Sequence, residues 1–311
     1  MSNALIPILD PRLVDNWTPA NVGELAVYWM TFYAKARKAP SSIARDKITL
    51  KKYILPAYGI CPLGEITGRN VEFWFLNLVK DSGLSAKSCN DVLVLFRKLL
   101  NDATRWGFIQ QNPLIFIRKM PLPERDMAFW NKTEVQLFLG YWQTRRHTPK
   151  MFWAVMLALY TGMRRGEILG LQWDAVDFSS GFITVKCSYC KAAKMVRNQT
   201  KSGTIRRVPI NSSLQVHLVR LKELTGSSGY VVPACHPDSF LKIFRRMSRE
   251  AGVKEIRFHD LRHTFASNFL MGGGSIYDLQ KLLGHSTVQV TERYTHFVPD
   301  HLRGKTEVLG F

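Results

Sequence analysis

The stretch MFWAVMLALYTGMRRGEILGLQW, residues 151–173, decides the fold of the second half of this chain. Its first ten residues carry no charge, which predicts a helix that is buried on all sides in a protein core. The run is far shorter than the roughly 18 apolar residues of a membrane-spanning helix, and the start MSNALIPILD lacks the basic run and long apolar core of a signal peptide. We therefore expect a core helix and no membrane-spanning segment.

The composition is that of a basic globular protein. Its 311 residues exceed one typical domain and suggest two. A formal net charge of +19, from 43 Lys and Arg against 24 Asp and Glu, accompanies a hydrophobic fraction of 46%. Such a charge attracts polyanions by releasing their counterions, which makes nucleic acid the leading partner and an anionic membrane surface the second.

The pattern from about 20 to 115 predicts a small all-helical domain. Thr18 can cap the first helix and Pro19 can take its first position. A second helix is expected at about 41–54, and two more fit NVEFWFLNLVKDSG and SAKSCNDVLVLFRKLLNDATRWG, the last ending at Gly107. Seven bases accompany a single acid, Asp46, between residues 35 and 52, which indicates either contact with phosphates or a solvated helix face: Lys35, Arg37, Lys38, Arg45, Lys47, Lys51 and Lys52.

The segment NPLIFIRKMPLPERD, residues 112–126, has the features of a linker between domains. It contains three prolines and breaks both the helical and the strand periodicity. We place the boundary near 120, which gives an N-terminal extension at 1–19, a helical domain at 20–118 and a second domain at 119–311.

The second domain is predicted to be rich in helices with a small antiparallel sheet. Asn131 and Glu134 form a capping-box pattern at a helix start. GFITVKCSY and TIRRVPI have the composition of short β-strands, and the region 178–222 around them holds nine Lys or Arg and no acid. The whole chain is therefore expected to be mainly α, with an α+β second domain.

Metal sites are possible on two patterns, and neither is complete. Cys187 and Cys190 form a CxxC that Cys235 and His236 could extend to a zinc site, but no ligand set with finger-like spacing follows. An odd total of five cysteines favours reduced thiols in a cytosolic protein. We expect Cys187 and Cys190 to be ordinary half-buried cysteines on a strand. His259 and His263 have the spacing of a zinc-protease pair, yet an Asp follows the first histidine where that motif has Glu. We expect no metal and no cofactor.

A different chemistry fits the arginines. Cleaving and rejoining a phosphodiester without a metal needs two guanidinium groups for the charge on the non-bridging oxygens, a nucleophile, and an acid for the leaving oxygen. Arg164 lies three positions before Glu167, so the carboxylate can brace the guanidinium from one helix face. An Arg–Glu pair at this spacing is also a common surface feature.

Two further stretches supply the remaining groups. FHDLRHTFAS, residues 258–267, places His259 and Arg262 on one helical face. In LLGHSTVQVTERYTH, His285 precedes Tyr294 by nine residues, and the turn residues after Gly284 indicate a new helix that carries the tyrosine. A lone histidine or tyrosine is usually structural, but these motifs occur together and in order.

Taken together, these motifs resemble those of tyrosine recombinases of the bacteriophage integrase type. TGMRRGEILGL is similar to the family's first arginine box, FHDLRHTFAS to the second, and LGHS and RYTH to the motifs that follow. ILPAYGICPLGEIT and ATRWGFIQQNPL resemble the family's core-binding domain, a SAM-like helical bundle, so that the likeness covers roughly residues 20–310. NQTKSGTIRRVPI is similar to the family's β-hairpin lysine segment. The resemblance assigns as catalytic residues Arg164, Lys201, His259, Arg262, His285 and Tyr294, with Lys194 and Lys191 as rivals of Lys201.

The resemblance implies a mechanism and partners. Tyr294 would attack the scissile phosphate and form a 3′-phosphotyrosyl link, with His259 as base, Lys201 as acid and His285 as donor to a phosphate oxygen. The substrate would be double-stranded DNA, bound by a homotetramer that exchanges its C-terminal tails, with accessory DNA-bending proteins as further partners. The expected setting is the bacterial cytoplasm, at the nucleoid or in a phage-infected host.

The implied role is integration or excision of a phage or mobile element. The roughly 20 residues before the first helix are too few for the arm-binding domain with which many phage integrases begin, which puts control through distant arm sites in doubt. The alternatives are a recombinase of the Xer type that resolves chromosome or plasmid dimers, a type IB topoisomerase, and a DNA-binding regulator without catalysis.

Overall fold

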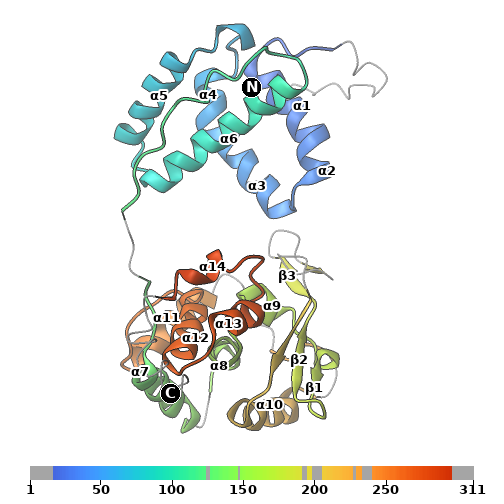
Figure 1. Ribbon diagram of the computed structural model, residues 1–311, viewed down its shortest axis with the longest axis vertical. Helices are drawn as coiled ribbons and strands as arrows, with labels where there is room; N and C mark the ends of the chain where they lie inside the picture. The colour runs from blue at the N-terminus through green and yellow to red at the C-terminus, as the bar shows by residue number, and fades with distance from the viewer. Residues whose placement is uncertain are drawn as a thin grey trace, which may run out of the picture. The chain divides into compact units, whose positions relative to one another are not determined.

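The computed structural model describes residues 17–123, 127–145, 148–190, 195–197, 205–226, 229–232 and 240–295. The chain divides into two compact units, Met1–Glu124 and Arg125–Phe311 (Figure 1). The first is helical, and the second combines helices with a small antiparallel sheet, as the sequence predicted. Among the described residues, no helix is both long and apolar enough to span a bilayer.

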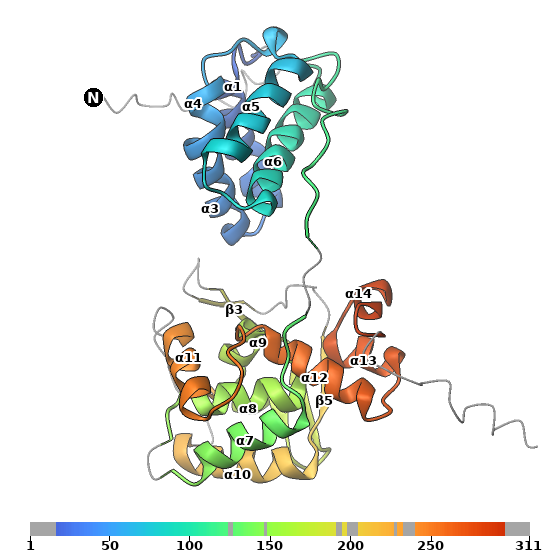
Figure 2. The ribbon, with the colours of Figure 1, turned by 90° about the vertical axis from the view of Figure 1, so that its left-hand side faces the viewer.

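The first unit is a bundle of helices interrupted by π-helical turns. Its longest helix, α6, has Ser85 as N-cap and is followed by Gly107 at a φ of 79°, as expected for the glycine after a helix. One face of α6 is buried against α1, α3 and α5 (Figure 2). The elements are α1 (Val22–Tyr28), η2 (Trp29–Ala34), α2 (Lys35–Arg37), α3 (Pro40–Thr49), η3 (Leu50–Ile54), α4 (Leu55–Tyr58), η4 (Leu63–Glu65), α5 (Gly68–Asp81) and α6 (Ala86–Arg105).

The first helix starts later than predicted. Asn21, not Thr18, is the N-cap, and its side chain accepts a hydrogen bond from the Glu24 backbone N–H at 2.9 Å. The next expected helix is also longer than predicted, since helical structure continues from Pro40 to Tyr58 through α3, η3 and α4. Pro56 lies just after the π-helical segment η3, where the regular α-helical hydrogen-bond pattern is already interrupted.

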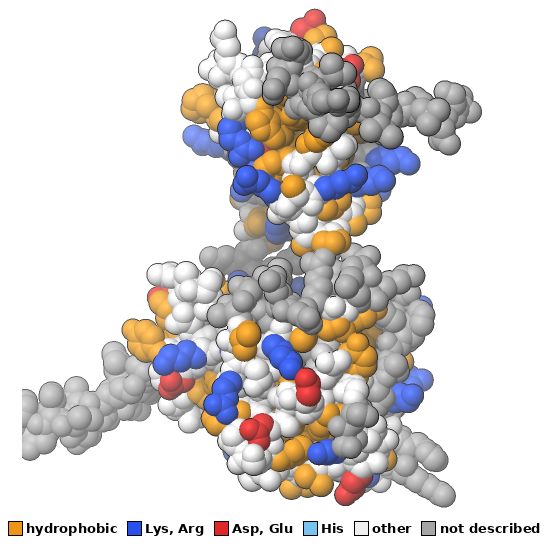
Figure 3. Space-filling view, turned by 90° about the vertical axis from the view of Figure 1, so that its right-hand side faces the viewer, with side chains coloured by type: hydrophobic (Ala, Val, Ile, Leu, Met, Phe, Trp, Pro, Cys, Tyr) orange, Lys and Arg blue, Asp and Glu red, His pale blue; other side chains and the backbone are white. Residues whose placement is uncertain are grey.

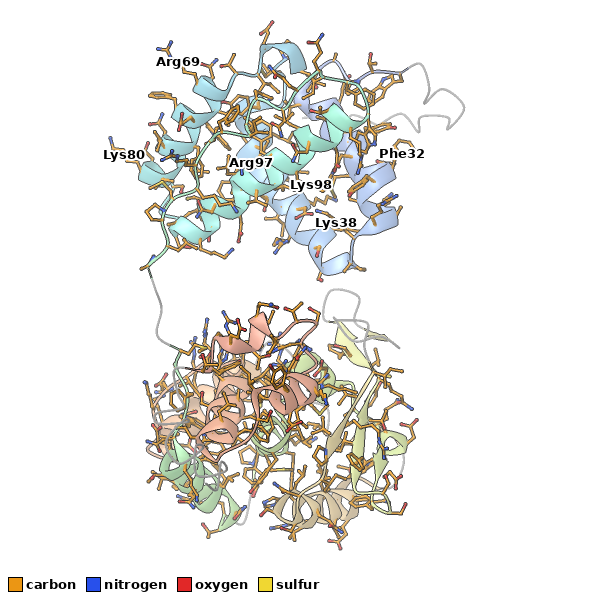
Figure 4. All side chains as sticks on the ribbon, viewed as in Figure 1. Phe32, Lys38, Arg69, Lys80, Arg97 and Lys98 are labelled. Atoms are coloured by element: carbon orange, nitrogen blue, oxygen red, sulfur yellow. The ribbon has the colours of Figure 1, made fainter. Side chains whose placement is uncertain are left out.

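Part of the proline-rich segment belongs to the first unit. Arg97 of α6 donates to the carbonyls of Leu114 and Ile117 (Figure 4), and both of those side chains are buried in the core of this unit. Asn90 exchanges two hydrogen bonds with the backbone of Met120. The chain is therefore fixed to α6 for some fifteen residues after that helix ends.

The second unit is built around α8. This helix is buried almost throughout and is packed against α7, α9, α10, α11 and α12, as its uncharged sequence predicted. Asn131 and Glu134 form the predicted capping box of α7. The helices are α7 (Lys132–Gln143), α8 (Met151–Thr161), α9 (Arg165–Leu169), η5 (Trp173–Ala175), α10 (Ser212–Thr225), α11 (Phe240–Glu250), α12 (Asp260–Met271), α13 (Ile276–Leu283) and α14 (Gln289–Glu292).

A three-stranded antiparallel sheet lies beside these helices in the order β1-β2-β5 (Figure 1). Its strands are β1 (Val176–Asp177), β2 (Phe182–Val185) and β5 (Arg206–Pro209), and Val185 pairs with Arg206. Strands β3 (Ser188–Cys190) and β4 (Met195–Arg197) form a separate antiparallel pair. Along β5 the side chains alternate between buried and exposed, so that Arg206 faces inward and Arg207 outward.

Candidate active site

Arg164 is the N-cap of α9, and Glu167 stands three residues later at the end of the first turn. The Arg164 Nη1 donates to the Glu167 Oε1 at 2.9 Å, and the Arg164 backbone N–H donates to Oε2 at 2.8 Å. Both contacts fix the arginine, whose side chain stays 24% exposed while that of Glu167 is 1% exposed. Glu167 therefore holds the Arg164 guanidinium in place, and the guanidinium is still accessible to a ligand.

Glu167 has a second basic partner that the sequence reasoning missed. Arg206 on β5 donates to both carboxylate oxygens, through Nη1 at 3.1 Å and Nη2 at 2.7 Å. Burial alone would raise the pKa of Glu167, but the hydrogen bonds and charges of Arg206 and Arg164 outweigh it and lower the pKa below its ordinary value. The carboxylate is therefore ionised and shared between two arginines.

Arg262 lies in α12 and is 3% exposed. Its Nη1 donates to the Gly162 carbonyl at 2.7 Å and its Nη2 to the Leu283 carbonyl at 2.6 Å. Burial, reinforced by the charge of Arg164, lowers its pKa to about 9, so the group stays charged at neutral pH. This side chain joins the end of α8, which leads to Arg164, to the end of α13, which leads to His285.

His259 is the N-cap of α12, directly before Asp260. The residue as a whole is exposed. Partial burial of its ring nevertheless lowers the pKa of His259, and the positive charge of Arg262 lowers it further. Asp260 is buried and accepts hydrogen bonds from Arg257, at 2.8 Å from Nη2. The Asp260 carboxylate is therefore bound to Arg257 at the start of α12 and does not point to a metal site.

His285 follows Gly284, the left-handed residue that ends α13. Its Nδ1 lies 2.8 Å from the hydroxyl oxygen of Thr291 in α14. Burial lowers the pKa of His285 to about 4, with Arg262 and Arg164 contributing, so the ring is neutral at pH 7. When Thr291 donates to Nδ1, the ring proton lies on Nε2, and that nitrogen is left as a donor.

Tyr294 was predicted to lie on a helix, but it does not. The helix after the turn, α14, ends at Glu292 after a single turn, and Tyr294 follows it. The side chain is 1% exposed and belongs to an apolar cluster that includes Leu279 and Leu283 of α13 and Leu270 of α12. Apolar contacts against these two helices, rather than helical periodicity, fix its position.

The hydroxyl of Tyr294 contacts His263, which the sequence reasoning had considered only as a metal ligand. The phenolic oxygen lies 2.7 Å from Nδ1 of His263. Burial lowers the pKa of His263 to about 4, with the neighbouring His259 contributing, and burial raises the pKa of Tyr294. The neutral ring accepts from the phenol when its proton lies on Nε2, and it donates to the phenolic oxygen when its proton lies on Nδ1.

Several predicted residues lie outside the described residues: Lys201, its rivals Lys191 and Lys194, Cys235, His236 and the tail after position 295. Cys187 lies between β2 and β3, and Cys190 ends β3. Within the described part of the chain, no three His, Cys, Asp or Glu residues are grouped closely enough to hold a metal ion.

The sequence of the second unit matches the model of the "Phage integrase family" over residues 129–301, which is more than half of the chain. The chain belongs to the phage integrase family of tyrosine recombinases.

Two of the relatives of this recombinase are named integrases. It is 26% identical to the ICEBs1 integrase of Bacillus subtilis over 279 residues, which cover 84% of this chain and 75% of that protein. It is 31% identical to the integrase of Escherichia phage 186 over 227 residues, which cover 73% of this chain and 60% of that protein. The recombinase thus spans between three fifths and three quarters of these relatives.

Solved structures share the fold of the recombinase. The Tn1549 transposon integrase in complex with a circular intermediate DNA aligns with a TM-score of 0.76 at 19% identity, covering 94% of this chain and all of that one. A lambda integrase in a tetramer bound to a Holliday junction aligns with a TM-score of 0.68 at 17% identity, covering 92% of this chain and 83% of that one. The predicted fold class, with a helical unit before the catalytic one, is confirmed.

The first unit of the recombinase exposes most of its predicted basic side chains. Six of the seven bases between residues 35 and 52 are exposed, whereas Lys38 pairs with the buried Asp46 and lies 4.4 Å above the Trp29 ring (Figure 4). Lys98 is likewise bound to Asp102 at 2.9 Å. Lys and Arg side chains are spread over the face drawn in Figure 3. Lys38 and Lys98 therefore stabilise the bundle, and the exposed bases remain available to an anionic partner.

Proposed function

We propose that this recombinase integrates or excises a mobile element by site-specific DNA cleavage and rejoining through Tyr294. One observation supports this most directly: Arg262 is hydrogen-bonded both to the end of α8, two residues before Arg164, and to the end of α13, two residues before His285. The two arginines and His285 are thus held in one region of the second unit. The names of the relatives from ICEBs1 and phage 186 favour a mobile element as substrate.

The proposed reaction is a transesterification. The Tyr294 oxygen attacks phosphorus, the bond to the 5′-oxygen breaks, and a 3′-phosphotyrosyl ester forms. Arg164 and Arg262 offset the charge on the non-bridging oxygens, for which planar guanidinium groups are suited. His285 donates from Nε2 to a phosphate oxygen. Lys201 protonates the leaving 5′-oxygen.

The nucleophile has to lose its proton during this reaction. The burial of Tyr294 favours the neutral phenol and raises its pKa. The charges of Arg262 and Arg164 act in the opposite direction and lower the pKa of the phenol. We assign His259, which is neutral and open to solvent, as the acceptor of the proton once a phosphate is bound.

The proposed partner is double-stranded DNA, with the enzyme acting as a homotetramer whose C-terminal tails are exchanged between protomers, assisted by accessory DNA-bending proteins. Solved relatives supply the analogy, since a lambda integrase forms a tetramer on a Holliday junction. The proposed place of action is the bacterial cytoplasm. Resolution of chromosome or plasmid dimers is the second candidate, because a XerC-like tyrosine recombinase of Caldanaerobacter is 24% identical over 93% of this chain.

The proposal is tested by trapping the covalent intermediate. Nicked duplexes made from the DNA that flanks the gene are incubated with the protein and denatured in SDS. We expect an SDS-resistant protein–DNA adduct with the natural sequence and none with Tyr294→Phe, although the variant binds the same DNA. Tyr277→Phe is the matched control, because Tyr277 is 65% exposed and lies at the start of α13, the end of the helix opposite His285. An adduct that persists in Tyr294→Phe would exclude Tyr294 as the nucleophile.

A further inference from the structure

Arg206 contacts two segments that the proposed mechanism depends on. Besides its two bonds to Glu167, its Nε donates to the carbonyl of Leu282 at 2.7 Å. Glu167 in turn holds Arg164, and Leu282 lies three residues before His285. The buried Arg206 guanidinium therefore links Glu167, which holds Arg164, to the end of α13, after which His285 follows.

The packing around Arg206 is close. A Cβ built on Gly284 would lie 2.9 Å from the Arg206 Cδ, and Gly284 has a φ of 65°. The glycine is therefore required both by its left-handed backbone and by the arginine that packs against it. Arg206 is also the first residue of β5, where it pairs with Val185 of β2.

We propose that Arg206 is a positioning residue that keeps Arg164 and His285 in register for DNA cleavage. This inference rests on the proposed function. A buried ion pair contributes little net stability compared with apolar residues of similar volume, so stability alone does not favour a charged group here. The planar fork of arginine meets both oxygens of Glu167 while Nε reaches the helix end. A lysine has a single nitrogen for these three bonds.

The test compares Arg206 with its neighbour. Arg207 follows on the same strand, faces outward and donates to the exposed Ser180 hydroxyl at 3.1 Å. The variants are Arg206→Lys, Arg206→Gln, Arg207→Lys and Arg207→Gln. Each is assayed with nicked flanking DNA under single-turnover conditions, which give the rate of adduct formation and its final amplitude separately. DNA affinity and thermal unfolding are measured alongside.

A misplaced catalytic group slows the reaction by up to about 10²-fold. We expect Arg206→Gln to lower the rate about 100-fold and Arg206→Lys about 10-fold, with DNA affinity and amplitude retained. Both Arg207 variants should react within about twofold of the natural protein. A merely structural role would lower the amplitude, because fewer molecules would be folded, and would leave the rate of the folded fraction unchanged.

The partner of Arg206 gives a second test. If Arg206 acts through Glu167, the double variant Arg206→Gln, Glu167→Gln should react no more slowly than the slower single variant. Arg206→Lys keeps a positive charge beside Glu167. If Arg206→Gln does not fold, the rate of Arg206→Lys is used for the comparison with the Arg207 variants. If the Arg206 variants react as fast as the Arg207 variants, the inference about Arg206 is wrong, and the proposed function still stands. A natural protein that forms no Tyr294-linked adduct overturns the proposed function itself.

Discussion

His263, which contacts Tyr294, and His285, which contacts Thr291, are held neutral by their surroundings. Burial lowers the pKa of His263 and of His285 to about 4 each, from an ordinary value of 6.5. Since the pKa is lower in the folded state, the unfolded chain binds more protons between about pH 6.5 and 4. The stability that depends on the neutral rings is therefore complete above about pH 6.5 and is lost as the pH falls toward 4.

We expect the second unit to unfold at lower temperature as the pH falls from 7 to 4.5, and the dependence to weaken in His263→Asn. For a ring as buried as that of His263, the difference between 6.5 and about 4 corresponds to at most about 3 kcal/mol. Thermal unfolding followed by circular dichroism at a series of pH values measures this. A pH dependence that is the same in the variant and the natural protein would show that His263 is not responsible.

At the same scale, the sequence predicts side chains that pair locally and misses those that pair across the fold. The bond between Arg164 and Glu167 is implied by their spacing of three. Arg206 reaches Glu167 from 39 residues away, and His263 meets Tyr294 from 31 residues away. No periodicity encodes either contact, because each depends on how β5 and the segment after α14 pack against other elements.

Among the elements, the end of α8 has strict requirements. Gly162 has a φ of 61°, and a Cβ on it would lie 2.5 Å from the Phe265 ring and 2.8 Å from Leu283. We expect Gly162→Ala to lower the free energy of unfolding by about 3 kcal/mol, from backbone strain and overpacking together. Chemical denaturation measures this change.

Gly181→Ala is the matched control for this substitution. Gly181 has a φ of 71° but no atom within 4 Å of a built Cβ, so it should lose only about 1 kcal/mol. Equal losses in the two variants would mean that Phe265 and Leu283 move aside without cost.

Helix boundaries were predicted where local chemistry alone sets them. The capping box of Asn131 and Glu134 is such a case and is confirmed. The start of α1 was wrong, although Thr18 and Asn21 are both good caps. The Val22 backbone N–H donates to the Cys61 carbonyl at 3.1 Å, a contact with the chain after α4 that selects Asn21. The new helix after Gly284 was predicted and is present as α14, but it ends at Glu292 and does not carry Tyr294, whose position depends on packing.

For the whole molecule, the net charge of +19 predicts a steep dependence of DNA binding on salt. A protein that contacts about 6–10 phosphates loses about 10³–10⁵ in affinity between roughly 50 and 200 mM salt, and we expect this range for a duplex of unrelated sequence. Titration of a labelled duplex at several salt concentrations gives the slope. A slope near zero would contradict phosphate contact by this protein.

The same titration locates the phosphate contacts on the first unit. Lys47 and Lys51 are exposed on α3 and η3, and replacing both by alanine should reduce the slope by about 2. Lys87→Ala is the control, because Lys87 is paired with Asp91 at 2.7 Å on α6. An unchanged slope in the double variant would place the contacts elsewhere.

The two bonds of Arg262 restrict how the enzyme can be switched on and off. With one nitrogen on the Gly162 carbonyl and another on the Leu283 carbonyl, this guanidinium cannot rotate away without leaving two backbone oxygens bare. The side of the candidate site that we propose to hold the phosphate is consequently rigid. If the proposed tetramer forms, a difference in activity between its protomers has to come from the phenol and the chain that carries it.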